Sequence, residues 1–538
     1  MNDTSGAFIS SLSPSPVALS SAVVVAVLLG YLLLPNTVER AVRHLPRPAT
    51  TLPIFHNSFD IVLRYPGRIY DFLLDETRKQ NGKTWIVQAM GRPVTIVLSS
   101  SEAFEHVLKT KFEDFGKGEI NYITLFDVLG NGIFAVDGVR WLHQRKTASH
   151  LFSLQMMRNT MEEAVKEYTA LLCGRLEEIS KNDEVINIKR LLDLFTMDVF
   201  TKIGFGIDLQ GLTSNKNPEF LDAFERASKN LLARFQAPMW AWQLRRWLKI
   251  GKEKQMAKDV KVINDLIFDI IARSMDRRKK QTKDISGMAE NESEGRKDLI
   301  SLFLEKEATE YGASGERAET DPALIRDMTV SFIAAGRDTT SQSMSWFLLM
   351  LNRYPSVLKR VREEIKEKLP GLVDGSMLVP NMEDVAQLIY LEAAIRESIR
   401  LNPVVALNAR TALRDTTLHD GTFIKAGTRV ALPHYAMARL TSVWGEDAEE
   451  YNPDRWIDAG TGKLIQMSPF KFTAFIGGPR MCLGMKFAFM EMKIAMAAVL
   501  SKFDVMTVKD PFAFTYSPSI TLTIKGPVDV RVQSIRDK

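Results

Sequence analysis

The feature that most constrains this chain is a loop near its C-terminus, from Phe475 to Gly484, which contains one of only two cysteines, Cys482. The loop is rich in glycine and proline, and the residues from Met485 onward are good helix formers with an apolar stripe. Cys482 is therefore expected on a loop that opens a helix, where the helix N-terminus stabilises a thiolate. Gly478 permits backbone shapes closed to other residues, so the loop can approach a flat cofactor. A thiolate held in this way is a candidate haem-iron ligand.

The order of residues in this loop is more specific than a lone cysteine, which is usually a small buried hydrophobe. Phe475, Gly478, Arg480, Cys482 and Gly484 stand in the order F-x-x-G-x-R-x-C-x-G. This resembles the haem-binding loop of the cytochrome P-450 monooxygenases. The resemblance implies haem b (iron protoporphyrin IX) as the cofactor, a sulfur–iron bond from the cysteine, Phe and Gly packed around it, and the Arg at a haem propionate.

Composition sets the broad class. The chain has 538 residues, of which 45% are apolar and 25% charged, as in an ordinary globular protein with a large core. The net charge of +5 (70 basic minus 65 acidic residues) is mild and argues against a dedicated nucleic-acid binder. Two cysteines rule out a disulfide framework. Cys173 lies in a helical pattern and is expected to be a buried hydrophobe.

The N-terminus departs from this average. Residues 17–34 contain no charge, and as a helix they would span ~27 Å, close to the hydrocarbon thickness of a bilayer. A cleaved signal peptide would want a basic start and a shorter apolar stretch. Residues 1–16 contain no Lys or Arg, whereas Arg40, Arg43 and Arg47 follow the apolar run. The positive-inside rule then predicts an uncleaved, single-pass anchor in the endoplasmic reticulum membrane, with the catalytic part in the cytoplasm.

The sequence after the expected anchor and its linker, from residue 53 onward, predicts a mainly α-helical domain with small β-sheets, the cytochrome P-450 fold by resemblance. Short β-rich runs at 84–88 and 94–98 predict a hairpin, with a turn at 91–93. A long helix is expected from Asp321 to Asn352, and further helices over 357–369 and 382–401. The polar stretch 274–296 reads as a solvated loop. The expected parts are a lumenal N-terminus (1–16), a transmembrane anchor (17–34), a proline-containing linker (35–52) and one haem-binding monooxygenase domain (53–538).

The long helix carries a second signal, the segment Ala335-Gly-Arg-Asp-Thr-Thr. A mid-helix glycine costs about 1 kcal/mol relative to alanine, so this segment is a poor choice for a plain core helix. One alternative is a simple helix kink made by side chains that bond backward. The functional interpretation is a groove for oxygen activation, in which Gly336 lets the cofactor approach. By resemblance to P-450 distal helices, Thr339 and Asp338 deliver protons.

Two further motifs are weak alone and gain weight from their context. Trp141 and Arg145 share one helical face and can both donate hydrogen bonds to a propionate, or can form an ordinary surface cation–aromatic pair. The pair Glu397 and Arg400 has the helical spacing of three. In P-450 enzymes such a pair joins a second arginine, here Arg455, in a buried structural cluster beside the haem.

These motifs follow one another in the P-450 order, so the resemblance covers nearly the whole chain. More narrowly, the phrases at 129–138, 335–340 and 434–439 resemble the branch of fatty-acid and alkane terminal (omega) hydroxylases. One departure is Leu407, which stands where many P-450 enzymes have a basic residue. Whether Arg410 contacts a propionate in its place is left open.

The resemblance also suggests a substrate region and partners. Residues 232–250, with three tryptophans beside Arg245 and Arg246, form either a core helix or an interfacial segment that enters the membrane. Electrons are expected from a separate NADPH–cytochrome P-450 reductase, with cytochrome b5 as a further partner, because 56 residues after Cys482 (538 minus 482) leave no room for a flavin domain. A basic docking face for the reductase is expected at Lys471, Lys486 and Arg140. The apolar walls of the substrate pocket are expected at Phe126, Phe332, Val404 and Ile520.

The sequence thus predicts a membrane-anchored haem-thiolate monooxygenase acting on an apolar, lipid-like small molecule, with a long-chain fatty acid at the omega position as the best candidate. Hydroxylation of a sterol, terpenoid or xenobiotic is one alternative. Another is an isomerase or dehydratase acting on peroxides, although such relatives tend to lack the counterpart of Thr339. The non-enzymatic alternative is a membrane-tethered helical binding protein, which would stay colourless when haem is supplied.

Overall fold

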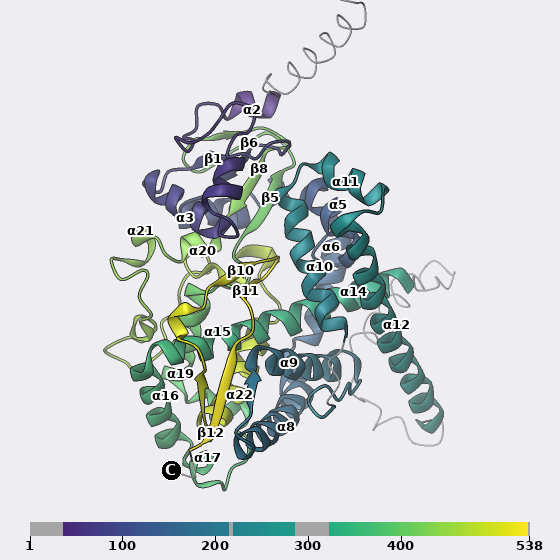
Figure 1. The fold of residues 1–538 in the computed structure, drawn as a ribbon, viewed down its shortest axis with the longest axis vertical. Helices are drawn as coiled ribbons and strands as arrows, with labels where there is room; N and C mark the ends of the chain where they lie inside the picture. Colours follow the sequence, from purple (N-terminus) through teal and green to yellow (C-terminus); the bar gives the residue numbers. More distant parts are fainter. Residues whose placement is uncertain (1–35, 215–218, 286–321, 536–538) are drawn as a thin grey trace, which may run out of the picture.

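The computed structural model describes residues 36–214, 219–285 and 322–535. These residues form a mainly helical body with small sheets, as expected, and Figure 1 shows the long helix α14–α15 crossing its middle. The α-helices are α2 Thr37–Ala41, α3 Ile69–Lys79, α4 Ser101–Glu105, α5 Gly118–Leu129, α6 Gly138–Leu151, α7 Leu154–Met156, α8 Glu162–Lys181, α9 Ile188–Phe205, α10 Glu219–Gln236, α11 Met239–Trp247, α12 Gly251–Ile285, α14 Pro322–Ile333, α15 Thr339–Arg353, α16 Pro355–Lys368, α17 Pro370–Asp374, α18 Met382–Ala386, α19 Ile389–Leu401, α20 His434–Met437, α21 Thr441–Trp444 and α22 Met485–Leu500.

Short helical turns of other kinds connect these elements. Four are π-helical: η1 Asp60–Arg64, η2 His106–Thr110, η4 Met157–Met161 and η7 Ala334–Asp338. The 3-10 turns are η3 Phe112–Asp114, η8 Pro453–Trp456, η9 Thr473–Phe475, η10 Gly478–Arg480 and η11 Pro511–Ala513.

The largest sheet has the order β1-β2-β8-β5-β3 and lies with α2 and α3 at one end of the molecule (Figure 1). The predicted hairpin is confirmed: β1 pairs antiparallel with β2, and Gly91 in the turn has φ +67°. The other sheets have the order β4-β12-β9, β10-β11 and β6-β7. The strands are β1 Trp85–Val87, β2 Thr95–Val97, β3 Phe115–Gly116, β4 Val185–Asn187, β5 Asn408–Ala412, β6 Thr416–Thr417, β7 Phe423–Ile424, β8 Arg429–Leu432, β9 Phe503–Thr507, β10 Tyr516–Pro518, β11 Leu522–Ile524 and β12 Asp529–Ser534.

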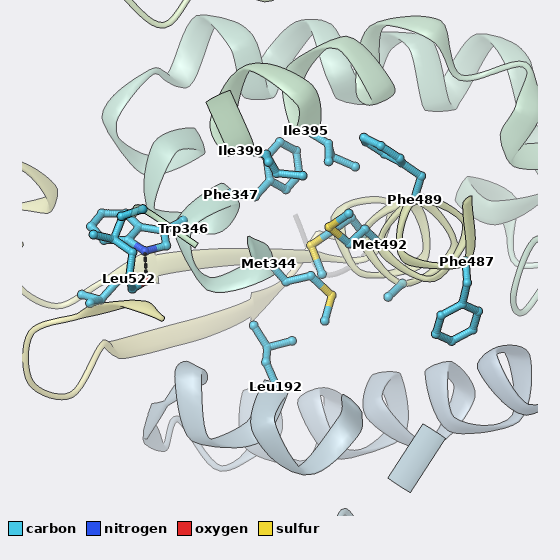
Figure 2. Close-up of a cluster of buried hydrophobic side chains, with 14 of the residues drawn as sticks. Leu192, Met344, Trp346, Phe347, Ile395, Ile399, Phe487, Phe489, Met492 and Leu522 are labelled. Atoms are coloured by element: carbon cyan, nitrogen blue, oxygen red, sulfur yellow. Dashed lines mark hydrogen bonds between the residues drawn. The ribbon is translucent and has the colours of Figure 1, made fainter. Parts of the chain in front are cut away.

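The core gathers around α15, which has buried residues on every side and packs against α9, α19 and α22. Figure 2 shows Met344 and Phe347 of α15 among Leu192 of α9, Ile399 of α19 and Met492 of α22. A fully buried side chain of this size contributes about 1.5–3 kcal/mol, so this contact anchors the helix that crosses the molecule. The buried indole of Trp346 on this helix is also satisfied, since its Nε1 donates to the Leu522 carbonyl at 3.0 Å (Figure 2).

Several sequence expectations are confirmed and two are wrong. The helix predicted up to Asn352 ends at Arg353, and Pro355 begins α16 in the first-turn position that suits proline. The region 382–401 is two helices, because the first ends at Ala386 and the second begins at Ile389. The solvated loop at 274–296 is wrong for its first part, since α12 continues to Ile285. The rest of that loop, the cap at Asp321 and the anchor at 17–34 lie outside the described residues.

No helix within the described ranges is long and apolar enough to span a bilayer.

Candidate functional site

The cysteine loop is held by its own backbone and by the helix that follows. The Cys482 N–H donates to the Phe475 carbonyl at 2.9 Å, which closes the loop between η9 and α22. Ile476 has φ +54°, an uncommon conformation for a β-branched residue, and such strain is found mostly at functional sites. The Phe475 ring packs on Phe472 at 5.9 Å and on Phe489 of α22 at 5.3 Å, so it fixes the loop to the start of that helix.

Gly478 is required by two independent constraints. Its φ is +76°, and a Cβ added there would lie 2.0 Å from the Leu108 carbonyl oxygen at the end of η2. Any other residue would both strain the backbone and collide with a peptide group. The sequence expected this glycine to permit close approach to a flat cofactor, but the close approach that the structure shows is to the protein backbone.

The thiol of Cys482 is accessible, yet protein surrounds it closely. The residue is exposed by its accessible surface, but burial raises the pKa of its thiol. An accessible surface and a pKa raised by burial occur together when a sulfur atom faces an enclosed space instead of bulk solvent. The Gly484 N–H and the Arg145 charge act in the opposite direction on this pKa and favour the thiolate. The other cysteine, Cys173, is buried, as expected.

The π-helical segment η7 interrupts an otherwise buried helix with a few residues that keep some accessible surface. From residue 326 to 351 every residue is buried except Ala334, Ala335, Gly336 and Thr339, which are half-buried. The Thr339 hydroxyl donates to the Ala335 carbonyl at 2.6 Å. π-helical turns inside α-helices are frequent at functional sites, and this one coincides with the predicted oxygen-activation segment. The helix α15 that follows packs against α22, the helix that begins after Cys482.

The glycine of this segment has a different role from the one expected. A Cβ on Gly336 would lie 1.9 Å from the ring of Phe200 on α9, so that ring fills the space beside the glycine. Gly336 therefore permits α9 to pack against η7. Thr196 of α9 supports the same contact, because its hydroxyl donates to the Arg337 carbonyl at 2.9 Å within the π turn.

Asp338 is enclosed in a network of polar side chains. Its Oδ2 accepts a hydrogen bond from the Thr521 hydroxyl at 2.6 Å, and its Oδ1 lies 3.3 Å from Arg337 Nη1. Arg337 in turn lies 3.4 Å from Asp193 of α9. Burial raises the pKa of Asp338, although Arg337 and the Thr521 hydroxyl oppose the shift. The carboxyl is only 7% exposed, so a relay of protons from solvent requires this network to open.

The residues predicted at a propionate meet around one indole ring. Trp141 and Arg145 lie on α6, and the Arg480 guanidinium lies 4.2 Å from the centroid of the Trp141 ring. Arg145 lies 5.9 Å from the same centroid and donates to the Met481 carbonyl at 2.7 Å, next to Cys482. The structure thus brings Trp141, Arg145, Arg480 and the cysteine loop together.

Positive charge is in excess at this place. Arg480 pairs with Asp137 at 2.5 Å, while its Nε is buried without a partner among the described residues. Arg410 is 2% exposed, and within the described ranges its Nη1 donates to the Ala409 carbonyl at 2.9 Å. Burial lowers the pKa of Arg410 to about 10, with a contribution from Arg480. The pKa of Lys117 lies well below its usual value because of burial, with contributions from Arg410 and Arg480.

This cluster fits a haem. Two propionate carboxylates would add to the negative charge of Asp137 and offset most of the positive charge of Lys117, Arg145, Arg410 and Arg480. They would also give the Arg480 Nε an acceptor. The accessible, enclosed sulfur of Cys482 supplies the metal ligand on the adjoining loop. Leu407, at the position of the expected basic residue, instead packs against the hydrophobic core, whereas Arg410 lies in the cluster.

The Glu397 cluster has a fully buried pair, Glu397 and Arg400, at its centre. Glu397 is 0% exposed and pairs with Arg400 at 2.7 Å and with Arg455 at 2.8 Å. It also accepts hydrogen bonds from Trp456 Nε1 at 2.9 Å and from the Asn452 N–H at 3.0 Å. Arg400 continues to the carbonyls of Ala438, Ala448 and Glu450. The cluster ties α19 to the segment 438–456, which precedes the cysteine loop.

The four residues expected to line a substrate pocket are only partly brought together. Val404 and Ile520 lie near each other, because the Leu522 N–H donates to the Val404 carbonyl at 2.6 Å, and Thr521 reaches Asp338. Phe332 precedes η7 and is buried in the core. Phe126 lies on α5 with its side chain 42% exposed and its ring against Tyr122.

Comparison with known proteins identifies the family. The family model described as cytochrome P450 matches residues 46–528. The chain belongs to the cytochrome P450 family. Cytochrome P450 94C1 of Arabidopsis thaliana is 34% identical over 445 residues, covering 82% of this chain and 84% of the relative. Cytochrome P450 86B1 of the same plant is 32% identical (85% and 80% covered), and cytochrome P450 94A1 of Vicia sativa is 32% identical (76% of each). The protein is therefore a P450 monooxygenase with a haem-thiolate cofactor, a redox partner and a small-molecule substrate.

Sequence reasoning missed several residues of the site. Asp137 is the N-cap of α6 and accepts hydrogen bonds from the backbone N–H groups of Lys117 and Gly118. An aspartate directly before a glycine and a helix is a recognisable cap signal. Glu491 of α22 bonds to Thr340, beside Thr339, and burial raises the pKa of its carboxyl far above the ordinary value. Its helical context gave no sign of this, because burial of a single acidic residue follows from tertiary packing.

Proposed function

We propose that this P450 hydroxylates the terminal (omega) carbon of a long-chain fatty acid. The observation that carries the proposal is the enclosed sulfur of Cys482 on the loop that opens α22, the helix that packs against α15, whose first residue is Thr339. The relatives of the 94 and 86 groups and the resemblance to terminal hydroxylases support the lipid substrate. One oxygen atom of O2 enters a C–H bond and the other leaves as water, with two electrons from NADPH.

The residues of the chain have separate tasks in this proposal. Cys482 is the metal ligand, and Arg145, Arg410, Arg480 and Trp141 hold the propionates of the haem. When bound, the haem supplies O2 activation and insertion of one atom into the substrate. Phe475 and Gly478 keep the loop in place through the contacts described above.

Proton delivery is assigned to Asp338 and Thr339. Burial keeps a proton on Asp338 at a higher pH than usual, and Thr339, the half-buried residue that follows η7, carries a hydroxyl at the start of α15. Movement of the Asp338 carboxyl away from Thr521 would bring a proton donor to the threonine. The rival isomerase or dehydratase needs no such delivery, so the presence of both residues favours the monooxygenase.

The substrate entrance is proposed to lie at the membrane. In α11 and the residues after it, Trp240, Leu244, Trp247 and Leu248 are exposed, whereas Trp242 is 2% exposed and packs against Arg234. Tryptophans beside arginines suit the headgroup region of a bilayer. Each alternative for residues 232–250 therefore holds in part: one face of the segment belongs to the core, and the other is proposed to lie at the membrane interface.

Localisation and electron supply follow from the same reasoning. Residues 17–34 are proposed to anchor the chain in the endoplasmic reticulum, with the domain from residue 53 in the cytoplasm. Arg140 and Lys486 are exposed, and Lys471 is half-buried with its ammonium over Trp444 at 4.9 Å. These three are proposed as the docking face for the NADPH reductase. If turnover with reductase does not change as salt rises, this docking face is wrong.

Product analysis tests the function. The full chain with a reductase and NADPH is incubated with fatty acids of graded length, alkanes, sterols and a lipid peroxide, and products are identified by mass spectrometry. Terminally hydroxylated acids are expected, and their formation should need both NADPH and O2. Rearrangement of the peroxide without reductase would favour the isomerase, and hydroxylation of the sterol alone would overturn the fatty-acid assignment.

A further inference from the structure

Two arginines in the largest sheet stand apart from the haem-propionate cluster. Arg92 lies in the turn between β1 and β2, is 7% exposed, and neither its Nη1 nor its Nη2 has a partner within the described part of the chain. Arg429 begins β8, pairs in register with Thr95 and with Thr411, and has one long hydrogen bond, at 3.4 Å, to the Asn121 side-chain oxygen.

Among the residues that the structure describes, neither arginine forms an ion pair with a carboxylate. Burial alone lowers the pKa of Arg92 to about 10. Burial, with a contribution from the charge of Arg92, lowers the pKa of Arg429 to about 10. Buried charges are normally paired, since an unpaired one carries a large desolvation cost. The Arg92 guanidinium, with two donors left without a partner among the described residues, and Arg429, on which its charge acts, therefore form a site suited to an anion.

The two arginines lie between the end of α10 on one side and the segment around Ser58 on the other. A Cβ on Gly91 would lie 2.8 Å from Pro238, so the turn bearing Arg92 touches the connection between α10 and α11. The Arg429 guanidinium lies 5.2 Å from the ring centroid of Phe235, at the end of α10. On the other side, the Met90 N–H donates to Ser58 at 2.8 Å, next to the exposed ring of Phe59.

This place is distinct from the haem cluster although the same sheet carries both. Arg410 is opposite Val430 across β5 and β8, and Arg429 is opposite Thr411. Because successive side chains of a strand point to opposite faces, Arg410 and Arg429 project from opposite faces of the sheet. The anion that Arg92 and Arg429 bind is therefore not a propionate held by Arg410.

We propose that Arg92 and Arg429 clamp the carboxylate of the fatty-acid substrate, with its apolar chain leading from the exposed apolar surface inward. This rests on the proposed function and deepens it. Guanidinium groups bind a planar carboxylate through two parallel hydrogen bonds, which a neutral ester cannot match. An acid fixed by its head presents the opposite end of its chain to the space beside Cys482, and this would select the terminal carbon.

The test compares an acid with its ester. The full-length, haem-loaded protein is titrated with hexadecanoic acid and with methyl hexadecanoate, and binding is followed by the change in haem absorption. The wild type is expected to bind the acid more tightly. Arg92→Gln and Arg429→Gln should each weaken acid binding at least tenfold and leave ester binding unchanged. Arg64→Gln is the matched control, because Arg64 is exposed and lies near the same surface.

Each other outcome overturns the clamp. Equal loss of acid and ester binding would indicate general damage to the pocket, and unchanged acid binding, or no binding of either compound, would show that the arginines do not hold the substrate. A loss only of binding to phosphatidic-acid vesicles would assign the pair to a lipid headgroup. Failure of the proposed function is distinguishable, because it would appear as wild-type turnover, with reductase and NADPH, that yields no terminally hydroxylated fatty acid.

Thermal unfolding without ligand gives a readout independent of binding. Removing an unpaired buried charge should raise the unfolding temperature of Arg92→Gln above that of the wild type, whereas Arg64→Gln, which loses the ion pair with Asp60, should not raise it. A large fall in the unfolding temperature of Arg92→Gln would mean that its guanidinium stabilises the empty protein, which contradicts the clamp.

Discussion

Replacing Glu397 by glutamine should destabilise the protein more than almost any other isosteric change. Oε1 accepts from Arg400 Nη2 at 2.8 Å, Arg455 Nε at 2.8 Å and the Asn452 N–H at 3.0 Å. Oε2 accepts from Arg400 Nε at 2.7 Å and Trp456 Nε1 at 2.9 Å. Whichever oxygen becomes an NH2 group, at least two donors lose their acceptor, and both arginines lose the negative charge they face.

The size of the effect follows from the burial of the cluster. Breaking a fully buried ion pair costs about 3–5 kcal/mol. At about 1.4 kcal/mol for each factor of ten, the unfolded population rises by roughly two to three and a half powers of ten. Since domains are stable by about 5–15 kcal/mol, Glu397→Gln should retain only part of its stability and lose haem on mild heating.

Urea unfolding followed by tryptophan fluorescence and by haem absorption measures this loss. Glu446 is exposed in the same segment, so Glu446→Gln is the matched control and should stay within about 0.5 kcal/mol of the wild type. If Glu397→Gln unfolds within about 1 kcal/mol of the wild type, then the carboxylate is not the shared acceptor described here, and the argument from burial fails.

Three further predictions concern single contacts. Gly478→Ala should abolish haem incorporation, measured by haem absorption, because its Cβ would lie 2.0 Å from the Leu108 carbonyl oxygen; normal haem content would refute this. Gly336→Ala should destabilise the fold through a contact at 1.9 Å with the Phe200 ring, and Phe200→Leu in the same chain should restore part of the loss of unfolding temperature. Glu491 has a raised pKa, so above the ordinary carboxyl pKa only the unfolded state ionises and stability falls with rising pH. Glu491→Gln should therefore gain stability over the wild type by up to about 1.4 kcal/mol per pH unit above that value, and a pH-independent difference in urea midpoints would contradict it.

The sequence was informative wherever a short motif by itself restricts the local backbone. The cysteine loop could be identified because glycine, proline and a following helix specify its backbone, and the β1–β2 hairpin because its alternation and turn agree. The contacts of the glycines could not be predicted. Gly336 and Gly478 were expected to face a cofactor, whereas Phe200 and the Leu108 carbonyl fill their space, which depends on elements far away in the sequence.

Buried charge was the second limit of sequence reasoning. The cluster of Glu397, Arg400 and Arg455 could be proposed from its motifs, but three of the five hydrogen bonds to Glu397 come from residues 452, 455 and 456, 55 to 59 positions further along the chain. The unpaired Arg92 has no motif at all, because a single arginine in a turn is usually solvated. Only its burial by the surrounding elements reveals the missing partner.

The most direct test of the central claim is the carbon-monoxide difference spectrum of the reduced protein. Wild type and Cys173→Ser should both show the band of a thiolate-ligated haem, since Cys173 is buried in the core. Cys482→Ser should lose that band while its fold, measured by circular dichroism, is unchanged. A thiolate band that survives in Cys482→Ser would contradict the account.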